Sequence, residues 1–256
     1  MAYTSSILYI IVLLAAALIP PLYLLQRVKA MDRIEPEPPA LLKKLYLYGI
    51  VGAVPVIFLE YLGDSIADMF QSDPLIYMFI AYFCVPGFIE EGMKYFVVKK
   101  TTWKNPAFNY TYDAIVYSVF ASLGFASIEN IMYVFNYGLG TAIVRAFLSI
   151  PAHCCFGVYM GQQYAKAKEA EMKGEDAKRK TYLRRAYLYA AVLHGTYDFL
   201  AMSQNLQIAF YVFFIIFAYF GFMEVKKASA SDHPIDTYIH QSEDTFVLCA
   251  QDTEIS

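Results

Sequence analysis

The sequence predicts an all-α protein: a polytopic membrane helix bundle of about seven transmembrane helices, with the N-terminus outside and the C-terminus cytoplasmic. The first observation is composition, since 58% of the 256 residues are hydrophobic and only 17% are charged, against about 25% charged residues in a soluble domain. The second is that nearly uncharged stretches of about 20 residues recur, each able to cross a hydrocarbon core of roughly 30 Å. The third is the one-sided placement of the basic residues. An ordinary soluble enzyme is excluded.

Seven apolar segments are predicted to be spanning helices, because in lipid the backbone must satisfy its polar groups within each segment. In chain order they are Ile7–Leu25, Leu45–Leu62, Leu75–Val98, Tyr112–Asn136, Thr141–Gln163, Leu183–Ser203 and Leu206–Glu224. No Lys or Arg precedes the first segment, unlike in a signal peptide, so we expect it to stay as a membrane anchor.

Orientation follows from the basic residues. Eighteen of the 20 Lys and Arg residues lie in or beside the connections after the first, third, fifth and seventh segments. The opposite connections contain none, and the first of them carries Asp64, Asp68 and Asp73. Because Lys and Arg are enriched in cytoplasmic loops, the basic connections are predicted to be cytoplasmic. The net charge of −3 does not indicate a nucleic-acid partner.

Two parts of the chain are distinguished by composition. Residues 1–227 are predicted to form the transmembrane domain. Residues 228–256 contain six acidic residues and lack helical periodicity, so we expect an acidic, flexible cytoplasmic tail.

Polar side chains inside the spans are the candidates for function. A charged side chain at the bilayer centre costs about 2.5–3.5 kcal/mol, so such residues must face one another or a wet cavity. The candidates are Glu90, Glu91, Lys94, Glu129, Asn130, Arg145, His153, His194 and Asp198.

The third span holds three of them. Glu90 and Lys94 are four residues apart, share a helix face and predict a structural ion pair. Glu91 lies about 100° further round the helix, and we expect it to face a cavity. Pro86-Gly87, one turn earlier, predicts a kink that lets water reach Glu91.

The remaining candidate residues lie in the next three spans. Glu129 follows a stretch with five small residues, which suits close helix packing; they are Ala121, Ser122, Gly124, Ala126 and Ser127. For Asn130 and His153, a hydrogen bond that only joins helices and a functional role both stay open. His194 and Asp198 are four apart on one helix face, a spacing that suits an oriented general base, two metal ligands or a structural hydrogen bond. Gly195 is expected to leave room for a substrate backbone.

The ordered set Glu90-Glu91-x-x-Lys94, Phe125-x-x-x-Glu129-Asn130, His153 and His194-x-x-x-Asp198 resembles the PrsW family of bacterial intramembrane proteases, which is related to the CAAX-type and bacteriocin-processing membrane proteases. The resemblance covers about Val85–Phe199. It implies a transmembrane protease domain over 1–227 with core motifs in 85–199. The active site that it implies consists of Glu90, Glu91, Glu129, His153, His194 and Asp198.

The resemblance also implies a class of substrate and a cellular location. Family members make the first, site-1, cut in a single-span anti-sigma factor on its extracytoplasmic side, as part of a stress response. The expected location is the bacterial cell membrane, and the expected partners are that substrate and the lipid bilayer, with no nucleic acid.

Two mechanisms fit the residues. In one, Glu91 is the base that activates water, and His194, oriented by Asp198, polarises the carbonyl. In the other, His153 and His194 bind Zn together with Glu91, Glu129 or Asp198. We expect no cofactor, for two reasons. The CAAX-type resemblance implies a glutamate and histidine mechanism, and two histidines with three carboxylates match poorly the preference of Zn for nitrogen and sulfur ligands. Zn stays possible.

Other classes of function use the same residues. A proton-coupled membrane transporter or channel would employ them as a relay, and a non-catalytic scaffold would need all of them to be incidental. The ordered motifs favour the protease.

Overall fold

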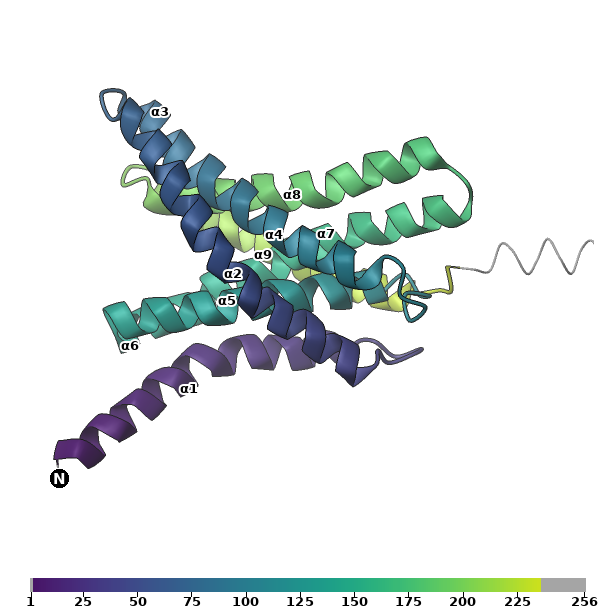
Figure 1. Ribbon diagram of the computed structural model, residues 1–256, viewed down its shortest axis with the longest axis horizontal. Coiled ribbons are helices and arrows are strands. Elements are labelled where there is room, and N and C mark those ends of the chain that lie inside the picture. The colour runs from purple at the N-terminus through teal and green to yellow at the C-terminus, as the bar shows by residue number, and fades with distance from the viewer. Residues whose placement is uncertain (1, 236–256) are drawn as a thin grey trace, which may run out of the picture.

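The computed structural model describes residues 2–235, and in that range the chain is a bundle of helices (Figure 1). The helices are α1 (Ala2–Lys29), α2 (Pro39–Ala67), α3 (Pro74–Met78), α4 (Val85–Thr102), α5 (Asp113–Tyr137), α6 (Leu139–Phe147), α7 (Ser149–Met172), α8 (Asp176–Met202) and α9 (Gln207–Ala230). A 3₁₀ turn, η1 (Asp68–Phe70), follows α2, and a π-helix, η2 (Phe79–Cys84), joins α3 to α4. The predicted all-α membrane bundle is confirmed.

Six helices of the described chain are long and apolar enough to cross a membrane. They are Ile7–Lys29, Pro39–Phe70, Pro74–Thr102, Asp113–Tyr137, Leu139–Met172 and Gln207–Ala230. Helix α8 contains the predicted sixth span, Leu183–Ser203, and packs against α4 and α7. It is not among the six, because its first half is rich in Lys and Arg. The protein is thus a multi-pass membrane protein, while the count of seven and the orientation stay predictions.

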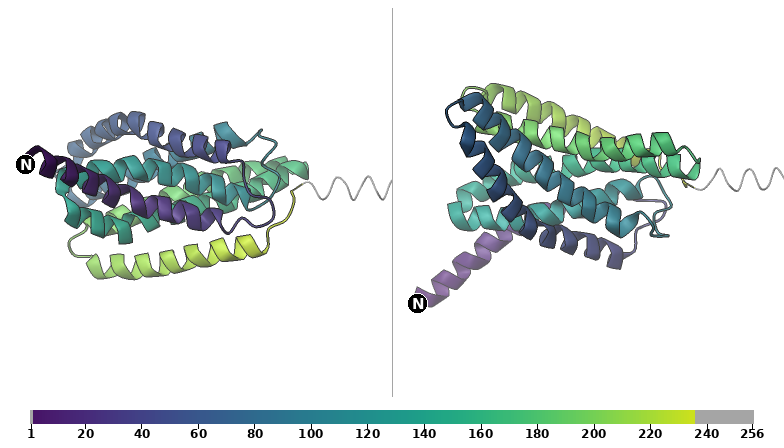
Figure 2. Two further views of the ribbon diagram at one scale, coloured as in Figure 1. Left: turned by 90° about the horizontal axis from the view of Figure 1, so that it is seen from below. Right: turned by 45° about the horizontal axis from the view of Figure 1, so that its top comes forward.

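The connections fall at two ends of the bundle. In Figures 1 and 2 the α1–α2, α4–α5 and α7–α8 connections lie at one end, together with the C-terminal end of α9. The α2–α3 and α8–α9 connections and the short α6 lie at the other. The basic connections therefore share one end, as the charge pattern requires. We call it the basic end and the other the opposite end.

Helix α5 is the centre of the bundle and packs against α1, α2, α4, α6 and α7. Its small residues permit this, as predicted. A Cβ atom on Gly124 would collide with the backbone of Tyr46 in α2, so the two helices meet at backbone distance. Ser127 lies beside this crossing and accepts a hydrogen bond of 2.9 Å from the Tyr46 hydroxyl.

The start of the predicted tail is packed on the bundle. Helix α9 continues to Ala230, and the Ile235 backbone amide donates to the carbonyl of Asn109 at 2.7 Å. The Ile235 side chain is buried. Backbone hydrogen bonds thus join residues 233–235 to the α4–α5 connection, while the flexibility of the tail stays a prediction. The rest of the predicted tail, 236–256, lies outside the described residues.

Candidate active site

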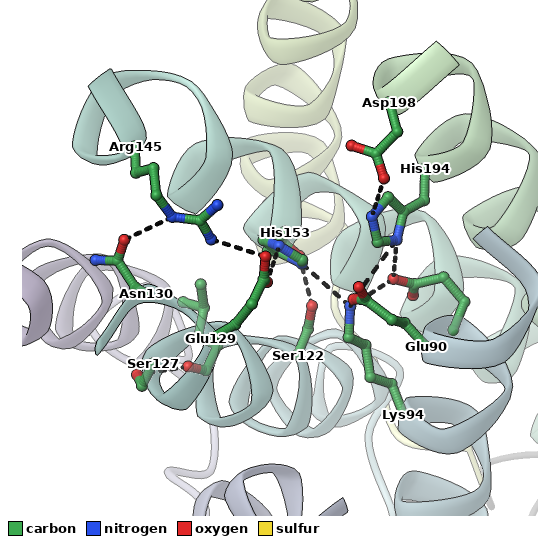
Figure 3. Close-up of polar contacts among 12 residues, drawn as sticks. Glu90, Lys94, Ser122, Ser127, Glu129, Asn130, Arg145, His153, His194 and Asp198 are labelled. Atoms are coloured by element: carbon green, nitrogen blue, oxygen red, sulfur yellow. Dashed lines mark hydrogen bonds and ion pairs between the residues drawn. The ribbon is translucent and has the colours of Figure 1, made fainter. Parts of the chain in front are cut away.

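Two glycines bring the acidic residues of α4 against the imidazole of α8. A Cβ atom on Gly87 would lie 2.6 Å from the carbonyl oxygen of Ala191 and 2.9 Å from the amide nitrogen of Gly195. Only hydrogen fits at such a contact, so the α4 and α8 backbones touch there. Glu90 and Glu91 follow one turn after Gly87, which sets them beside His194 (Figure 3).

The helix is irregular just before this crossing. Pro86 has no amide hydrogen, and its ring would clash with the carbonyl four residues earlier in a regular α-helix. The π-helix η2, which ends at Cys84, widens the backbone at that point. The distortion predicted at Pro86-Gly87 thus begins one turn earlier. The room expected beside Gly195 is not free for a substrate, because the backbone carbonyl of Phe83 fills it.

The ammonium group of Lys94 lies at the centre of the polar cluster. Its Nζ atom donates to Glu90 Oε2 at 2.9 Å and to Glu91 Oε1 at 2.7 Å, and it lies 3.1 Å from Nδ1 of His153. The ring of Phe125 lies 4.5 Å away on another side. The predicted pair of Glu90 and Lys94 is therefore one part of a contact that includes both glutamates and a histidine.

The ring of His194 is held on both nitrogens. Nδ1 lies 2.9 Å from Glu91 Oε1 and 3.9 Å from Glu90 Oε2, and Nε2 lies 3.2 Å from Asp198 Oδ2. The Phe156 ring stacks on the imidazole with 4.6 Å between centroids. These contacts fix the position of the ring and both of its nitrogens.

His153 is held in the same way. Its Nε2 lies 3.0 Å from Glu129 Oε2, while Nδ1 faces Lys94. The Ser122 hydroxyl donates to the backbone carbonyl of His153 at 2.7 Å, which ties α7 to α5. In both histidines, Nε2 thus faces a carboxylate and Nδ1 faces the centre of the cluster.

Glu129 has a second partner that the sequence reasoning left outside the site. Arg145 of α6 approaches Glu129 Oε1 with Nη2 at 2.9 Å and donates from Nε to Asn130 Oδ1 at 2.8 Å. Asn130 in turn donates to the carbonyl of Ala17 in α1 at 2.7 Å. The signal was present: a lone carboxylate in a span needs a cation, and Arg145 was the unassigned basic residue in a neighbouring span.

A cavity of about 510 Å³ lies among these helices. Its acidic, basic and histidine lining residues are Glu60, Asp64, Glu90, Glu129, Arg145, His153, His194 and Asp198. Glu91 was expected to face a cavity, but it does not line this one and is fully buried, whereas Glu90 lines it. Glu60 was also missed, because it lies near the end of its apolar segment, where a carboxylate reaches the interface.

The six predicted site residues thus lie in one polar network. Five of them line the cavity, whereas Glu91 is buried outside the cavity and contacts Lys94 and His194. Buried imidazoles and carboxylates beside a polar cavity can activate water by taking its proton and can stabilise a developing negative charge.

The donor set also suits a metal ion. Glu90, His153 and His194 are buried and offer ligand atoms within 4.8 Å of one another. Two imidazoles and one carboxylate form a ligand set that catalytic Zn takes. The carboxylate in this group is Glu90 rather than Glu91, Glu129 or Asp198, which the sequence reasoning had considered.

The fold and the site define a membrane-embedded enzyme with a hydrolase-type polar cavity. The description "PrsW family intramembrane metalloprotease" belongs to the family that matches residues 37–222. The chain belongs to this PrsW family, and it is an intramembrane peptidase of the bacterial membrane.

Curated relatives agree with the family assignment. The chain is 38% identical to Protease PrsW of Clostridioides difficile over 192 residues, which cover 73% of this chain and 78% of the relative. It is 34% identical to Protease PrsW of Geobacillus kaustophilus over 193 residues, covering 75% and 81%. It is 30% identical to Protease PrsW of Bacillus subtilis over 217 residues, covering 84% and 95%. No solved structure matches the chain.

Proposed function

We propose that this peptidase makes the site-1 cut in a single-span membrane protein of the anti-sigma factor type, at a bond near the outer face of the membrane. The substrate class comes from the family resemblance of the motifs. The side of the membrane comes from the cavity, whose lining includes Asp64, Tyr137 and Met202. These residues lie near the ends of α2, α5 and α8 at the opposite end of the bundle, which the charge pattern predicts to be outside.

The convergence of Glu90, His153 and His194 on one cavity carries the proposal. Glu90 is the glutamate of the pair that reaches the cavity, so we assign it the contact with the reacting water. Glu91 then acts as a positioning residue, because its Oε1 holds both Lys94 and Nδ1 of His194. The sequence alone suggested the reverse, with Glu91 as the base that activates water and Glu90 as the ion-pair partner of Lys94.

Two further carboxylates hold the imidazole rings in place. Glu129 and Asp198 face Nε2 of His153 and His194, respectively. A carboxylate on one ring nitrogen sets the tautomer and leaves the other nitrogen for a proton or a metal. Both rings therefore present Nδ1 toward Glu90, Glu91 and Lys94.

Glu90, His153 and His194 are the residues that would hold the metal that the family description names. A bound metal would supply an acidified water and polarise the scissile carbonyl. Lys94 donates to Glu90 Oε2 and lies within hydrogen-bonding distance of Nδ1 of His153, so its ammonium group would compete with a metal for these residues.

The test is cleavage by the full-length protein in liposomes. A single-span anti-sigma-type protein is co-reconstituted, and the products are identified by mass spectrometry. We expect one cut on the outer side of the substrate span, which Glu90→Gln abolishes.

Glu224→Gln is the matched control, because Glu224 is a carboxylate of helix α9 that contacts Gln162 and does not line the cavity. Full activity of Glu90→Gln would disprove the assigned role of Glu90. A cut on the cytoplasmic side, or no cut with wild-type protein, would contradict the proposed substrate geometry.

A further inference from the structure

A second buried carboxylate cluster lies at the basic end of the bundle, away from the cavity. Asp32 is in the α1–α2 connection, Glu37 lies two residues before α2, and Asp113 is the first residue of α5. Their side chains are 6%, 3% and 0% exposed, respectively. Each offers an oxygen atom, and these atoms lie within 4.8 Å of one another.

Within the part of the chain that the structure describes, the cluster has no cation in direct contact, although the charge of Lys29 lowers the pKa of Asp32. Among the described residues, no Lys or Arg forms an ion pair with any of the three carboxylates. Nearby acidic groups add to the negative charge: Asp232 and Glu35 both act on Asp32. Burial, reinforced by these neighbours, raises the pKa of Asp32 to about 6, and burial with Asp32 nearby raises that of Glu37 to about 7.

Protein donors satisfy only some of the oxygens. Asp113 Oδ2 accepts from the amides of Asn109 and Tyr110 at 3.1 and 2.7 Å, and Asp32 Oδ2 accepts from the Glu37 amide at 3.3 Å. Oδ1 of Asp113 and Oδ1 of Asp32 are buried without a hydrogen-bond partner. A buried oxygen that lacks a hydrogen-bond donor destabilises the protein, and more so when it is charged.

The contacts of the Tyr117 hydroxyl group show the same shortage of hydrogen-bond donors. It lies 2.7 Å from Glu37 Oε2 and 2.9 Å from the carbonyl oxygen of Ala107, and both of these atoms are acceptors when Glu37 is ionised. One hydroxyl hydrogen cannot serve both. When its carboxylates are ionised, the cluster therefore has more oxygen acceptors than the surrounding groups can satisfy.

We propose that Asp32, Glu37 and Asp113 form a binding site for a hard divalent cation of the calcium or magnesium class. Three carboxylates without a nitrogen or sulfur donor are the ligand type that these ions prefer. The unpartnered oxygens of Asp32 and Asp113 would become ligands of the ion. The positive charge of the ion would offset the buried negative charge.

The site would join segments that are distant in sequence. Its ligands come from the α1–α2 connection and from the start of α5. The C-terminal segment reaches the same place, because Asp232 Oδ1 accepts from the Tyr112 amide at 2.8 Å and from the Thr111 hydroxyl at 2.9 Å. A bound ion would thus fasten the N-terminal anchor to the central helix, beside the packed end of α9.

This site is separate from the active site. Asp113 and Glu129 are sixteen residues apart on α5, which corresponds to about 24 Å at 1.5 Å per residue. The proposal does not depend on the peptidase mechanism, and it can be tested without a substrate.

The test uses full-length protein in detergent, treated with EDTA and transferred to chelator-free buffer. Terbium ions are added and their sensitised luminescence is recorded, because Tyr117 contacts the cluster and its ring lies 5.6 Å from that of Phe108, which lies 6.4 Å from that of Trp103. Calcium and magnesium chloride are then added as competitors, and thermal unfolding is measured with each salt.

We expect terbium emission that calcium or magnesium displaces, and an increase in the unfolding temperature of at least about 3 °C at saturating cation. The cation that competes at the lower concentration identifies the preferred ion. Asp32→Asn and Glu37→Gln keep the side-chain size and are expected to weaken terbium binding at least 10-fold. Glu175→Gln is the matched control, because Glu175 is a carboxylate of the α7–α8 connection that pairs with Lys178 and is not part of the cluster.

A His194→Ala protein separates the two sites, since it alters the active site and leaves this cluster intact. It is expected to retain the terbium signal. The proposal is overturned if no cation stabilises the wild-type protein, if Asp32→Asn and Glu37→Gln respond like wild type, or if the signal disappears in His194→Ala.

Discussion

Gly87 of α4 and Gly195 of α8 are in backbone contact, and this contact determines where the two glutamates meet His194. A Cβ atom on Gly87 would lie 2.9 Å from the Gly195 nitrogen, and one on Gly195 would collide with the carbonyl of Phe83. Neither obstacle is a flexible side chain, so a methyl group at either position must separate the helices. The spacing of the site is therefore set one turn away from its polar atoms.

The first prediction follows from this contact. Gly87→Ala and Gly195→Ala should each lower the cleavage rate at least 10-fold, because a displacement near 1 Å is enough to spoil a catalytic geometry. Gly140→Ala is the control, since no atom lies within 4 Å of a Cβ atom built there. Rates are compared in the liposome assay at equal protein content. Wild-type rates in both glycine variants would contradict the role of the crossing.

The second prediction separates Glu90 from Glu91. Glu90→Gln should abolish cleavage with little change in unfolding temperature, because Glu91 still pairs with Lys94. Glu91→Gln should lower both activity and stability, the latter by about 2 kcal/mol, because it weakens the hold on Lys94 and His194 at once. Activity and thermal unfolding are measured for both. A stable, inactive Glu91→Gln beside an active Glu90→Gln would restore Glu91 as the base.

The third prediction concerns metal. Purified protein should contain one equivalent of metal at Glu90, His153 and His194, and His194→Ala should lose it, as measured by elemental analysis after gel filtration. Asp198→Asn should weaken metal binding about 10–100-fold, the usual effect of removing the carboxylate behind a ligating histidine. Cys84→Ala serves as the control, since Cys84 is a free thiol outside this group. Active wild-type protein without metal would instead support the metal-free mechanism.

The fourth prediction tests the Glu129 and Arg145 pair. Arg145→Met should destabilise the protein by about 2 kcal/mol, because it removes a cation from the Glu129 carboxylate, which lines the cavity and is only 20% exposed. Adding Glu129→Gln should recover part of that loss, although activity stays low. Thermal unfolding of the two single variants and the double variant gives the coupling energy. Strictly additive effects would mean that the pair contributes no coupling.

The fifth prediction is topological. Reporters fused after Lys180 and after Lys227 should both be cytoplasmic, and a reporter near Asp68 should be outside, because the basic residues occupy one set of connections. This also tests whether α8 crosses the membrane, since the α7–α8 connection and the end of α9 share a side only if it does. A cytoplasmic signal near Asp68 would contradict the orientation.

Much of the fold could be predicted because length and apolarity determine membrane helices. The sequence did not reveal that the predicted span Thr141–Gln163 is divided at Leu148 into α6 and α7. Pro151 offered a hint, since proline suits the first turn of a helix. The break matters for the site, because α6 carries Arg145 back toward Glu129.

The sequence could predict that these polar residues lie together in the membrane, but it could not predict which glutamate faces the cavity. Spacing shows that Glu90 and Glu91 differ by about 100° round the helix, yet which of them faces the cavity depends on how α4 is rotated against α8. That rotation is fixed by the contact of Gly87 with Gly195, a tertiary feature. The second cluster is hidden for a similar reason, because Asp32 and Glu37 meet Asp113 only after folding.

The position of Lys94 has a consequence for how the enzyme is made. The ammonium group carries a positive charge into the place where the two glutamates and a histidine converge. A newly inserted chain therefore brings its own counter-ion and does not have to wait for an external one before its helices close. A metal bound by Glu90, His153 and His194 would take contacts from a lysine that stays beside it. Folding and metal binding would then be separate events for this protease.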